Sequence, residues 1–414
     1  MAPSLEVDIM EKVFGIQGYC AESVEYEGER VVIRGARMEE KVACPRCGGA
    51  TRRYDHTRQD IIIGTTVTGR SIALRIVQWR VACDACGAIS TPDNGVTKGK
   101  RRHSRVFGSQ MVRYTEAMDN ESVGRLLGIS ASTVRRVDKE ELSDALERYR
   151  EALPALRPET LNIDETAHKS GHNYSTIVSD HRSGRVLWLE EGRTEESLMR
   201  AYAVLGNSTK DTSRVVMDFW EPYERVTRRQ LPRALIIPDR FHLARMVNRA
   251  IETERRLYQR KLAKEERIDM KKQARWVLLK RPNNLSAGDM ACLNELRTLN
   301  EPLYTMYLLK EELFDIFDRK LPLLLAKDAI IGWILTVQQT AFAFLKKFAR
   351  SLWDKLNTVL NWFSLPVSNG KAEGINNVIK ALLRRAYGYR DYDYFRLKVL
   401  QKCGLLMNYV THTF

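Results

Sequence analysis

The sequence predicts a multidomain protein of the α+β class, and three observations support this prediction. The first 95 residues alternate short β-type runs with glycine-containing turns. Residues 161–242 alternate strand and helix patterns, and residues 243–363 show only helical periodicity. At 414 residues the chain also exceeds the roughly 100–200 residues of an ordinary domain, so several domains are expected.

Composition indicates a soluble globular protein with a polyanionic partner. The chain is 44% hydrophobic and 29% charged, and 67 Lys and Arg against 52 Asp and Glu give a formal net charge of +15. Such a charge favours nucleic acid first and an anionic membrane second. The most apolar stretch, 329–345, is interrupted by Gln338 and Gln339 and is shorter than the roughly 20 residues of a membrane span, so it predicts a buried helix. Acidic residues at the N-terminus argue against a secretion signal, so a cytoplasmic protein is expected.

Residues 1–97 are predicted to form a β-rich zinc-ribbon domain. Two CxxC motifs, Cys44 to Cys47 and Cys83 to Cys86, are each followed by a glycine where a tight turn must aim two sulfurs at one ion. Cys83 lies 36 positions after Cys47, a long interval that the intervening β-type runs can close as a ribbon. Four ordinary buried cysteines, or a redox pair, are the alternatives. A closed Cys₄ site holds one structural Zn²⁺ and has no open position for catalysis.

Residues 98–153 predict a basic linker and a small helix-turn-helix domain. Within 120–138, apolar residues at helical spacing are followed by a Gly128 turn and by Ser130, which is placed to cap a second helix. That helix would present residue types that reach base edges and phosphates, namely Ser132, Thr133, Arg135 and Arg136. A three-helix bundle with an incidental basic face is the alternative.

The linker itself carries a run of cations suited to DNA. It would lie along the backbone or enter the minor groove as a flexible arm, although a charge run is also typical of a solvated linker. The residues concerned are Lys98, Lys100, Arg101, Arg102 and Arg105.

Two aspartates in the α/β region are candidate metal ligands. Asp164 lies in an apolar strand that starts at Leu161, and Asp218 ends another, so both can converge on one sheet edge. Converging carboxylates repel each other unless cations lie between them, and Mg²⁺ prefers a few carboxylates with water and phosphate oxygens. The arrangement suits two-metal phosphodiester chemistry. Taken singly, such residues are more often caps or turns. Glu165, next to Asp164, is expected on the opposite sheet face in a structural role.

Beyond the CxxC pairs and the helix-turn-helix, four segments carry a family likeness. They are IDETAHK at 163–169, VVMDFWEPY at 215–223, IIPDRFHLARMVNRA at 236–250 and SNGKAEGINNVIKALLRRAYGYRDYDYFR at 368–396. The last two are the most specific. With these motifs, the chain resembles bacterial insertion-sequence transposases of the ISL-three family over nearly its whole length.

The resemblance implies an RNase H-like α/β catalytic core with an all-helical insertion and an Asp-Asp-Glu triad, at positions that match Asp164, Asp218 and Glu373. It divides the chain beyond the linker into core 154–242, insertion 243–363 and a C-terminal core part 364–414. Asp239 is an alternative second carboxylate; otherwise Asp239 and His242 orient ligands or substrate. The helix opened by Glu373 would hold DNA through the cations Lys380, Arg384 and Arg385.

The function implied is binding of transposon ends, followed by cleavage and strand transfer of double-stranded DNA with two Mg²⁺ or Mn²⁺ ions. A homodimer or larger assembly on DNA is expected from the family, and no membrane partner is expected. A catalytically inactive DNA-binding regulator derived from a transposase is the main alternative. A nuclease or junction resolvase explains the metal site but leaves the zinc ribbon and the helix-turn-helix without a specific role.

Overall fold

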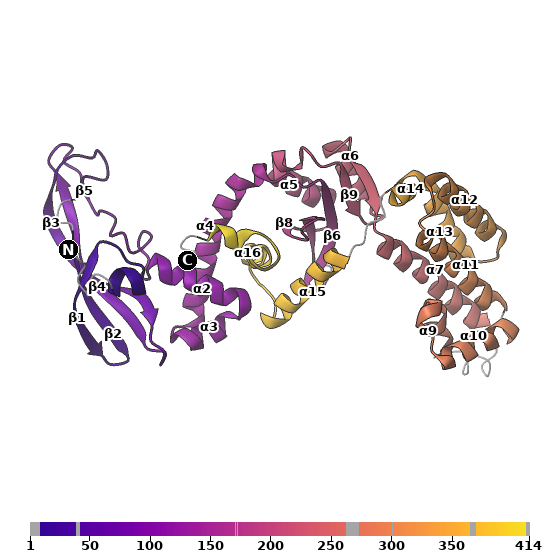
Figure 1. Ribbon diagram of the computed structural model, residues 1–414, viewed down its shortest axis with the longest axis horizontal. Coiled ribbons are helices and arrows are strands. Elements are labelled where there is room, and N and C mark those ends of the chain that lie inside the picture. Colours follow the sequence, from indigo (N-terminus) through magenta and orange to yellow (C-terminus); the bar gives the residue numbers. More distant parts are fainter. Residues whose placement is uncertain are drawn as a thin grey trace. The chain divides into compact units, whose positions relative to one another are not determined.

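The structure, a computed structural model, describes residues 9–38, 42–169, 171, 173–261, 273–299, 301–364 and 370–410. It divides into two compact units (Figure 1). Unit 1 comprises residues 1–153 and 381–414, and unit 2 comprises residues 154–380. The sequence analysis instead places 381–414 with the catalytic core.

Unit 1 begins with a π-helical turn (η1, Ile9–Val13) and a sheet in the order β1-β2-β4-β3. Strands β2 and β4 pair in parallel, and the other pairs are antiparallel. Ile33, Ile61 and Leu74 form part of its buried core. The β-type runs of the sequence, at 30–33, 60–63 and 72–81, lie within β2, β3 and β4, and β3 extends far beyond its run. The strands are β1 (Tyr19–Glu27), β2 (Arg30–Arg37), β3 (Thr51–Thr65), β4 (Ser71–Cys83) and the short β5 (Ile89–Ser90), which pairs with β4.

A helical cluster completes unit 1. The predicted turn is present: Gly128 adopts φ 64°, and the Ser130 side chain caps the following helix by accepting from the Thr133 N–H. Asp138 is fully buried and accepts hydrogen bonds from Tyr394 Oη at 2.6 Å and Lys398 Nζ at 3.0 Å. This network fixes the C-terminal helix to the cluster. The elements are α2 (Arg105–Ala117), α3 (Asn120–Leu127), α4 (Ala131–Ala152), η2 (Leu153–Ala155), α16 (Tyr392–Cys403) and η5 (Leu406–Tyr409).

Unit 2 contains a five-stranded sheet in the order β10-β9-β6-β7-β8. Strands β6, β7 and β8 pair antiparallel, whereas β9 and β10 run parallel to β6. The alternation of strand and helix patterns predicted for residues 161–242 is confirmed, as three strands, a helix, a strand, a helix and a strand. The elements are β6 (Thr160–Lys169), β7 (Asn173–Asp180), β8 (Val186–Glu191), α5 (Glu195–Leu205), η3 (Gly206–Thr209), β9 (Arg214–Met217), α6 (Glu221–Gln230) and β10 (Leu235–Pro238).

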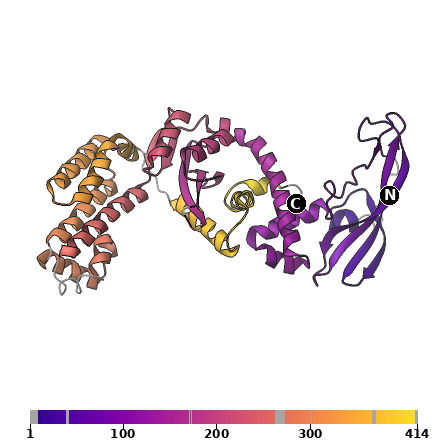
Figure 2. The ribbon, with the colours of Figure 1, turned by 180° about the vertical axis from the view of Figure 1, so that it is seen from behind.

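The rest of unit 2 is helical, as predicted, wherever the structure describes it (Figure 2). The stretch 329–345 is not one helix, because α12 ends at Gln339 and α13 begins at Ala343. Asn361 Nδ2 donates to Ile236 O at 2.8 Å and ties the last insertion helix to β10. The elements are α7 (Arg240–Lys261), α9 (Gln273–Leu279), η4 (Pro282–Asn284), α10 (Ala287–Leu299), α11 (Glu301–Asp318), α12 (Leu323–Gln339), α13 (Ala343–Asp354), α14 (Leu356–Ser364) and α15 (Gly370–Arg385).

The sequence has a strongly basic stretch at 255–281, and its residues 262–272 lie outside the described part of the chain. None of the described helices combines the length and the apolarity that crossing a bilayer requires.

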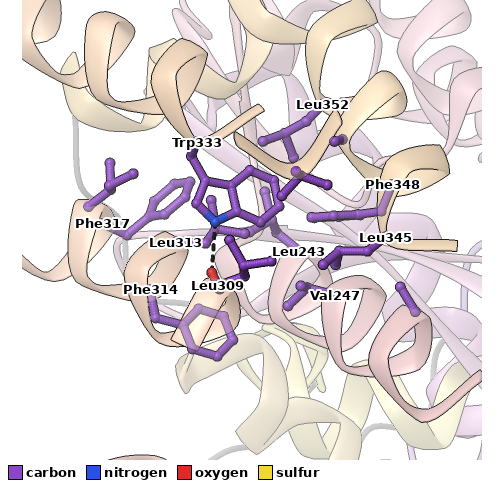
Figure 3. Packing of buried hydrophobic residues seen from close by; sticks show 14 of the residues in the cluster. Leu243, Val247, Leu309, Leu313, Phe314, Phe317, Trp333, Leu345, Phe348 and Leu352 are labelled. Atoms are coloured by element: carbon purple, nitrogen blue, oxygen red, sulfur yellow. Dashed lines mark hydrogen bonds between the residues drawn. The ribbon is translucent and has the colours of Figure 1, made fainter. Parts of the chain in front are cut away.

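Trp333 lies at the centre of the helical core (Figure 3). Its side chain is 1% exposed, its Nε1 donates to Leu309 O at 2.7 Å, and its ring meets Phe348 edge-on at 6.0 Å. Burial of a large ring and satisfaction of its single polar atom therefore occur together.

Replacing Trp333 with alanine should weaken this core by about 3–5 kcal/mol, because a large cavity opens among residues that cannot collapse to fill it. Amide hydrogen exchange of α11 to α13 measures the loss. Leu324 of the same helix is 75% exposed, so Leu324→Ala should change protection by less than about 0.5 kcal/mol. Equal effects of the two substitutions would contradict this account of the core.

Candidate functional site

Strand register in unit 2 brings three aspartates to one level. Ile163 of β6 pairs with Met217 of β9, and Met217 pairs with Pro238 of β10. All three strands are parallel, so the residue that follows each pair is an aspartate at the same edge of the sheet: Asp164, Asp218 and Asp239. The convergence predicted for Asp164 and Asp218 is therefore present.

His242 lies between two of these carboxylates. It is on the first turns of α7, which starts immediately after Asp239. Its Nδ1 is 2.6 Å from Asp218 Oδ2, and its Nε2 is 3.5 Å from Asp239 Oδ2. Asp239 is buried and also accepts the N–H of Phe241 at 2.9 Å, in the manner of a helix cap. Asp239 thus holds the start of α7 and the imidazole, whereas Asp218 faces Asp164.

Asp164 is held from the opposite side by α15. Its Oδ2 accepts from Asn376 Nδ2 at 2.7 Å, and its Oδ1 accepts from the N–H of Glu165 at 2.7 Å. Asn376 follows Glu373 by three residues, so the two lie on the same helix face, as the sequence indicates. The Asn376 Oδ1 atom is buried and has no hydrogen-bond partner among the described residues.

Electrostatics at this edge disfavour negative charge. Burial first, and then the nearby Asp218 carboxylate, raise the pKa of Asp164 to about 6. Burial would lower the pKa of His242, but the hydrogen bond to Asp218 and the negative charges of Asp218 and Asp239 together outweigh this effect, and the pKa is raised. The carboxylate pair therefore attracts positive charge to this position.

The residues present fit a divalent cation. One donor atom from each of Asp164, Asp218 and His242 lies within 4.8 Å of the others. Two carboxylates suit Mg²⁺ or Mn²⁺, and an imidazole is more compatible with Mn²⁺ than with Mg²⁺. Glu373 is not in this group; it is exposed on the first turn of α15 and lines the same cavity.

A cavity of about 800 Å³ opens over Asp164 and Asp239. Its acidic lining includes these two aspartates and Glu373, and its basic lining consists of Arg193, Arg240, Arg245, Lys320 and Lys380. Glu165 also lines it, contrary to the expectation of a structural position on the opposite sheet face. Pairing with β9 ends at Ile163, so the rest of β6 has no neighbour on that edge and Glu165 reaches the cavity.

Sequence reasoning missed Arg193. Its guanidinium lies 4.8 Å from the ring centres of both Tyr174 and Trp220, and its Nη1 is 3.1 Å from Glu165 Oε1. The only signal in the sequence was a cation directly after a Gly192 turn at the end of β8, which is too common a pattern to single out. Arg193 places positive charge beside the aspartates.

In unit 1 the four predicted zinc ligands meet. Cys44 Sγ and Cys86 Sγ are 3.9 Å apart, Cys47 Sγ and Cys83 Sγ are 3.5 Å apart, and all four sulfurs lie within 4.8 Å of one another. Zinc–sulfur bonds of about 2.3 Å in a tetrahedron require sulfurs roughly 3.8 Å apart, so the cluster fits structural Zn²⁺.

Both CxxC turns have the backbone that the spacing predicts. Gly48 and Gly87 follow the second cysteines with φ of 74° and 68°, a left-handed conformation that glycine adopts without strain. The N–H of Arg46 points at Cys44 Sγ at 3.4 Å, and the N–H of Cys86 points at Cys83 Sγ at 3.5 Å. Such donors stabilise thiolates.

The predicted DNA contacts of unit 1 fall into two groups. On α4, Ser132, Arg135 and Arg136 are exposed and Thr133 is half-buried. Both arginines have an acidic neighbour, Asp391 at 3.6 Å from Arg135 and Glu140 at 3.2 Å from Arg136. In the stretch 98–105, three cations are also held by acids of the same unit. Arg101 pairs with Glu140, Glu141 and Asp144; Lys98 pairs with Asp144; and Arg105 pairs with Asp93. Lys100 and Arg102 are exposed.

This stretch is not a flexible arm, which corrects one of the two expectations for it. Ile62 of β3 donates its N–H to Arg102 O and accepts from the Ser104 N–H, so the segment is fixed to the sheet. On α15, Lys380 and Arg384 are exposed, and Arg385 donates to Ala117 O at 2.5 Å.

Similar proteins are transposases. The chain is 28% identical to the transposase for insertion sequence element IS1001 of Bordetella parapertussis over 401 residues, which cover 95% of this chain and 98% of that protein. It is 26% identical to the transposase for insertion sequence element IS1557 of Mycobacterium tuberculosis over 417 residues, which cover 89% of each chain.

These similarities place the protein among insertion-sequence transposases, enzymes that cut and join DNA. The sequence profile of the ISL3 transposases matches residues 161–399, more than half of the chain. The protein belongs to the ISL3 family, as the resemblance implied.

Removing the metal should unfold the end of unit 1 that carries the cysteines, because a structural zinc site supplies folding free energy. Metal analysis should find one zinc ion per chain. This zinc should be removed by a strong chelator and should be absent from the Cys47→Ser variant. Melting followed by circular dichroism should then shift to lower temperature. Cys292 is half-buried and far from the cluster in sequence, so Cys292→Ser should keep its zinc. Equal zinc content in both variants would refute the Cys₄ assignment.

Proposed function

We propose that this protein binds the terminal inverted repeats of its insertion sequence and catalyses metal-dependent DNA cleavage and strand transfer. The observation that carries the proposal is the strand register that sets Asp218 beside Asp164, which lines a cavity with five basic side chains. The sheet order β10-β9-β6-β7-β8, antiparallel on one side and parallel on the other, supports an RNase H-like core. Family membership supplies the reaction.

Different residues at the site are assigned different roles. Asp164 and Asp218 would hold a divalent metal ion, and Glu373 of α15, which lines the same cavity as Asp164, would be the third carboxylate. Asn376 orients Asp164. Bound divalent ions would activate the attacking hydroxyl and stabilise the leaving oxygen. Arg240, Arg245 and Lys380 are placed to hold the phosphates that flank the cleaved bond.

We assign the second carboxylate to Asp218 rather than Asp239. Asp218 belongs to the group of ligand atoms that includes Asp164, whereas Asp239 is buried and engaged with the start of α7. Asp239 then orients His242, in the way that a carboxylate often orients an imidazole near a metal.

DNA recognition is assigned to α3 and α4 as a helix-turn-helix. Ser132, Thr133, Arg135 and Arg136 lie at the start of the second helix, where such motifs contact base edges and backbone. Lys100, Arg102 and Arg384 add exposed cations. We propose that the protein acts as a dimer or larger assembly, because transposition joins two ends.

Replacing any acid of the triad should abolish cleavage and leave DNA binding intact. Asp164→Asn, Asp218→Asn and Glu373→Gln preserve size, and each should slow nicking of a duplex that carries the terminal repeat by about a thousandfold or more. Cleavage is measured on labelled DNA with Mg²⁺ or Mn²⁺, and binding by fluorescence anisotropy. Asp211→Asn, an exposed acid of unit 2 paired with Arg157, should cleave normally.

Two outcomes would change the assignment. Tight binding by the unaltered protein without cleavage under any metal condition would favour the DNA-binding regulator. Loss of cleavage in Asp239→Asn together with normal cleavage in Asp218→Asn would identify Asp239 as the second carboxylate.

His242→Ala and Asp239→Asn should instead weaken the response to metal. Loss of such an orienting partner typically costs 10–100-fold in metal affinity. We therefore expect a higher Mn²⁺ concentration for half-maximal cleavage, with much of the maximal rate restored at saturating metal. Metal titrations measure this. Rates that stay low at every metal concentration would mean that these residues do more than position ligands.

A further inference from the structure

The outer half of the β3–β4 ribbon extends beyond the core of unit 1. We define it as residues 51–59 of β3 paired with residues 76–83 of β4. None of residues 51–59 is buried, in contrast to Ile61 and Ile63 farther along the same strand. The cysteine turns adjoin one end of this outer ribbon, and the core sheet adjoins the other. Both ends of the outer ribbon are therefore fixed.

The register assigns each side chain to a face. His56 lies opposite Trp79 and Arg58 lies opposite Val77, and residues two apart on a strand share a face. A bulge at Tyr54 keeps Arg53 on the same face, where its guanidinium lies 4.8 Å from the Trp79 ring centre. The His56 and Trp79 rings are 4.6 Å apart. We call this surface the basic face, defined by Arg53, His56, Arg58, Val77 and Trp79.

The opposite face has cations that are already neutralised. Arg80 forms a two-pronged ion pair with Asp55 and lies over the Tyr54 ring, and Arg52 is 3.5 Å from Asp84. On the basic face, by contrast, neither Arg53 nor Arg58 has an acidic partner within ion-pair distance among the described residues. The two faces carry equal numbers of arginines, but only one presents uncompensated charge.

A hollow of about 280 Å³ borders the basic face. Arg53, Trp79 and Arg37 line it, and Glu22 is its acidic member. Cations beside an indole ring form a surface that accepts both phosphate oxygens and the apolar edges of bases.

We propose that the basic face of the outer ribbon binds duplex DNA, as a contact surface separate from the helix-turn-helix. A two-stranded ribbon fits the major groove, which is about 12 Å wide. Nine residues at about 3.3 Å each span roughly 30 Å, close to one helical turn of DNA. Arg53 and Arg58 contact phosphates, and Trp79 faces base edges. Because both ends of the ribbon are fixed, little ordering entropy is lost on binding.

The proposal rests on the proposed function, since it assumes that the partner is the element's own end. The test uses the full chain and a duplex that carries the terminal repeat, with affinity measured by fluorescence anisotropy at several salt concentrations. Each phosphate contact contributes about 0.9 to the slope of log affinity against log salt, so Arg53→Ala with Arg58→Ala should lower the slope by about 1.8. A fourfold rise in salt should then weaken the unaltered protein about tenfold more than the variant.

The matched control is Arg52→Ala with Arg80→Ala on the opposite face, which removes the same net charge from the same ribbon. Its slope should equal that of the unaltered protein. Both variants must retain their zinc. Hydroxyl-radical footprinting should show the basic-face variant losing protection over one segment of the repeat, and Arg135→Ala with Arg136→Ala losing a different segment.

Equal slopes for the basic-face variant and the control would overturn the inference, and so would a slope change confined to single-stranded DNA. If the unaltered protein does not bind repeat DNA at all, the proposed function fails instead, and the two failures are distinguishable.

Discussion

The register of three parallel strands is the constraint on which the rest of unit 2 depends. Once Ile163, Met217 and Pro238 are paired, an aspartate must follow each at one edge of the sheet. Carboxylates brought together at one sheet edge repel each other unless hydrogen-bond donors or cations compensate their charges. Two helices supply donors, the imidazole of α7 and the amide of α15, so the placement of both helices follows from the need to satisfy the carboxylates.

The helical insertion must also bring the chain back to the site. The chain leaves the site along α7 and must return to it at α15, more than a hundred residues later. The core that the insertion helices form includes Val216 of β9 and Ile237 of β10. The insertion therefore packs against the same strands that carry Asp218 and Asp239, and its stability supports the position of those residues. A separate domain on a flexible tether would give no such support.

Sequence patterns predict the structure correctly where it depends on residues that are close together in the chain. The CxxC turns, the Ser130 cap and the strand succession are set by residues a few positions apart, and all are present. Patterns failed where distant partners decide. Alternation along a strand predicts that Glu165 and Asp164 point to opposite faces of the sheet. The alternation does not show where pairing with β9 ends. Family likeness predicts that residues 381–410 belong to the catalytic core. In the structure they belong to unit 1, where Tyr394 and Lys398 donate hydrogen bonds to the buried Asp138 on α4.

The net charge of the chain likewise does not show which cations are available for binding. A net charge of +15 indicates a polyanionic partner without locating it. The most conspicuous basic run, 98–105, is largely neutralised because α4 and the preceding loop present acids to Arg101, Lys98 and Arg105. A cation without an acidic neighbour exchanges water and counterions for phosphate without first losing an ion pair. In unit 1 that criterion favours Arg53 and Arg58 over their neighbours Arg52 and Arg80, although no property of the sequence separates the two pairs. Only the register of β3 with β4 does so.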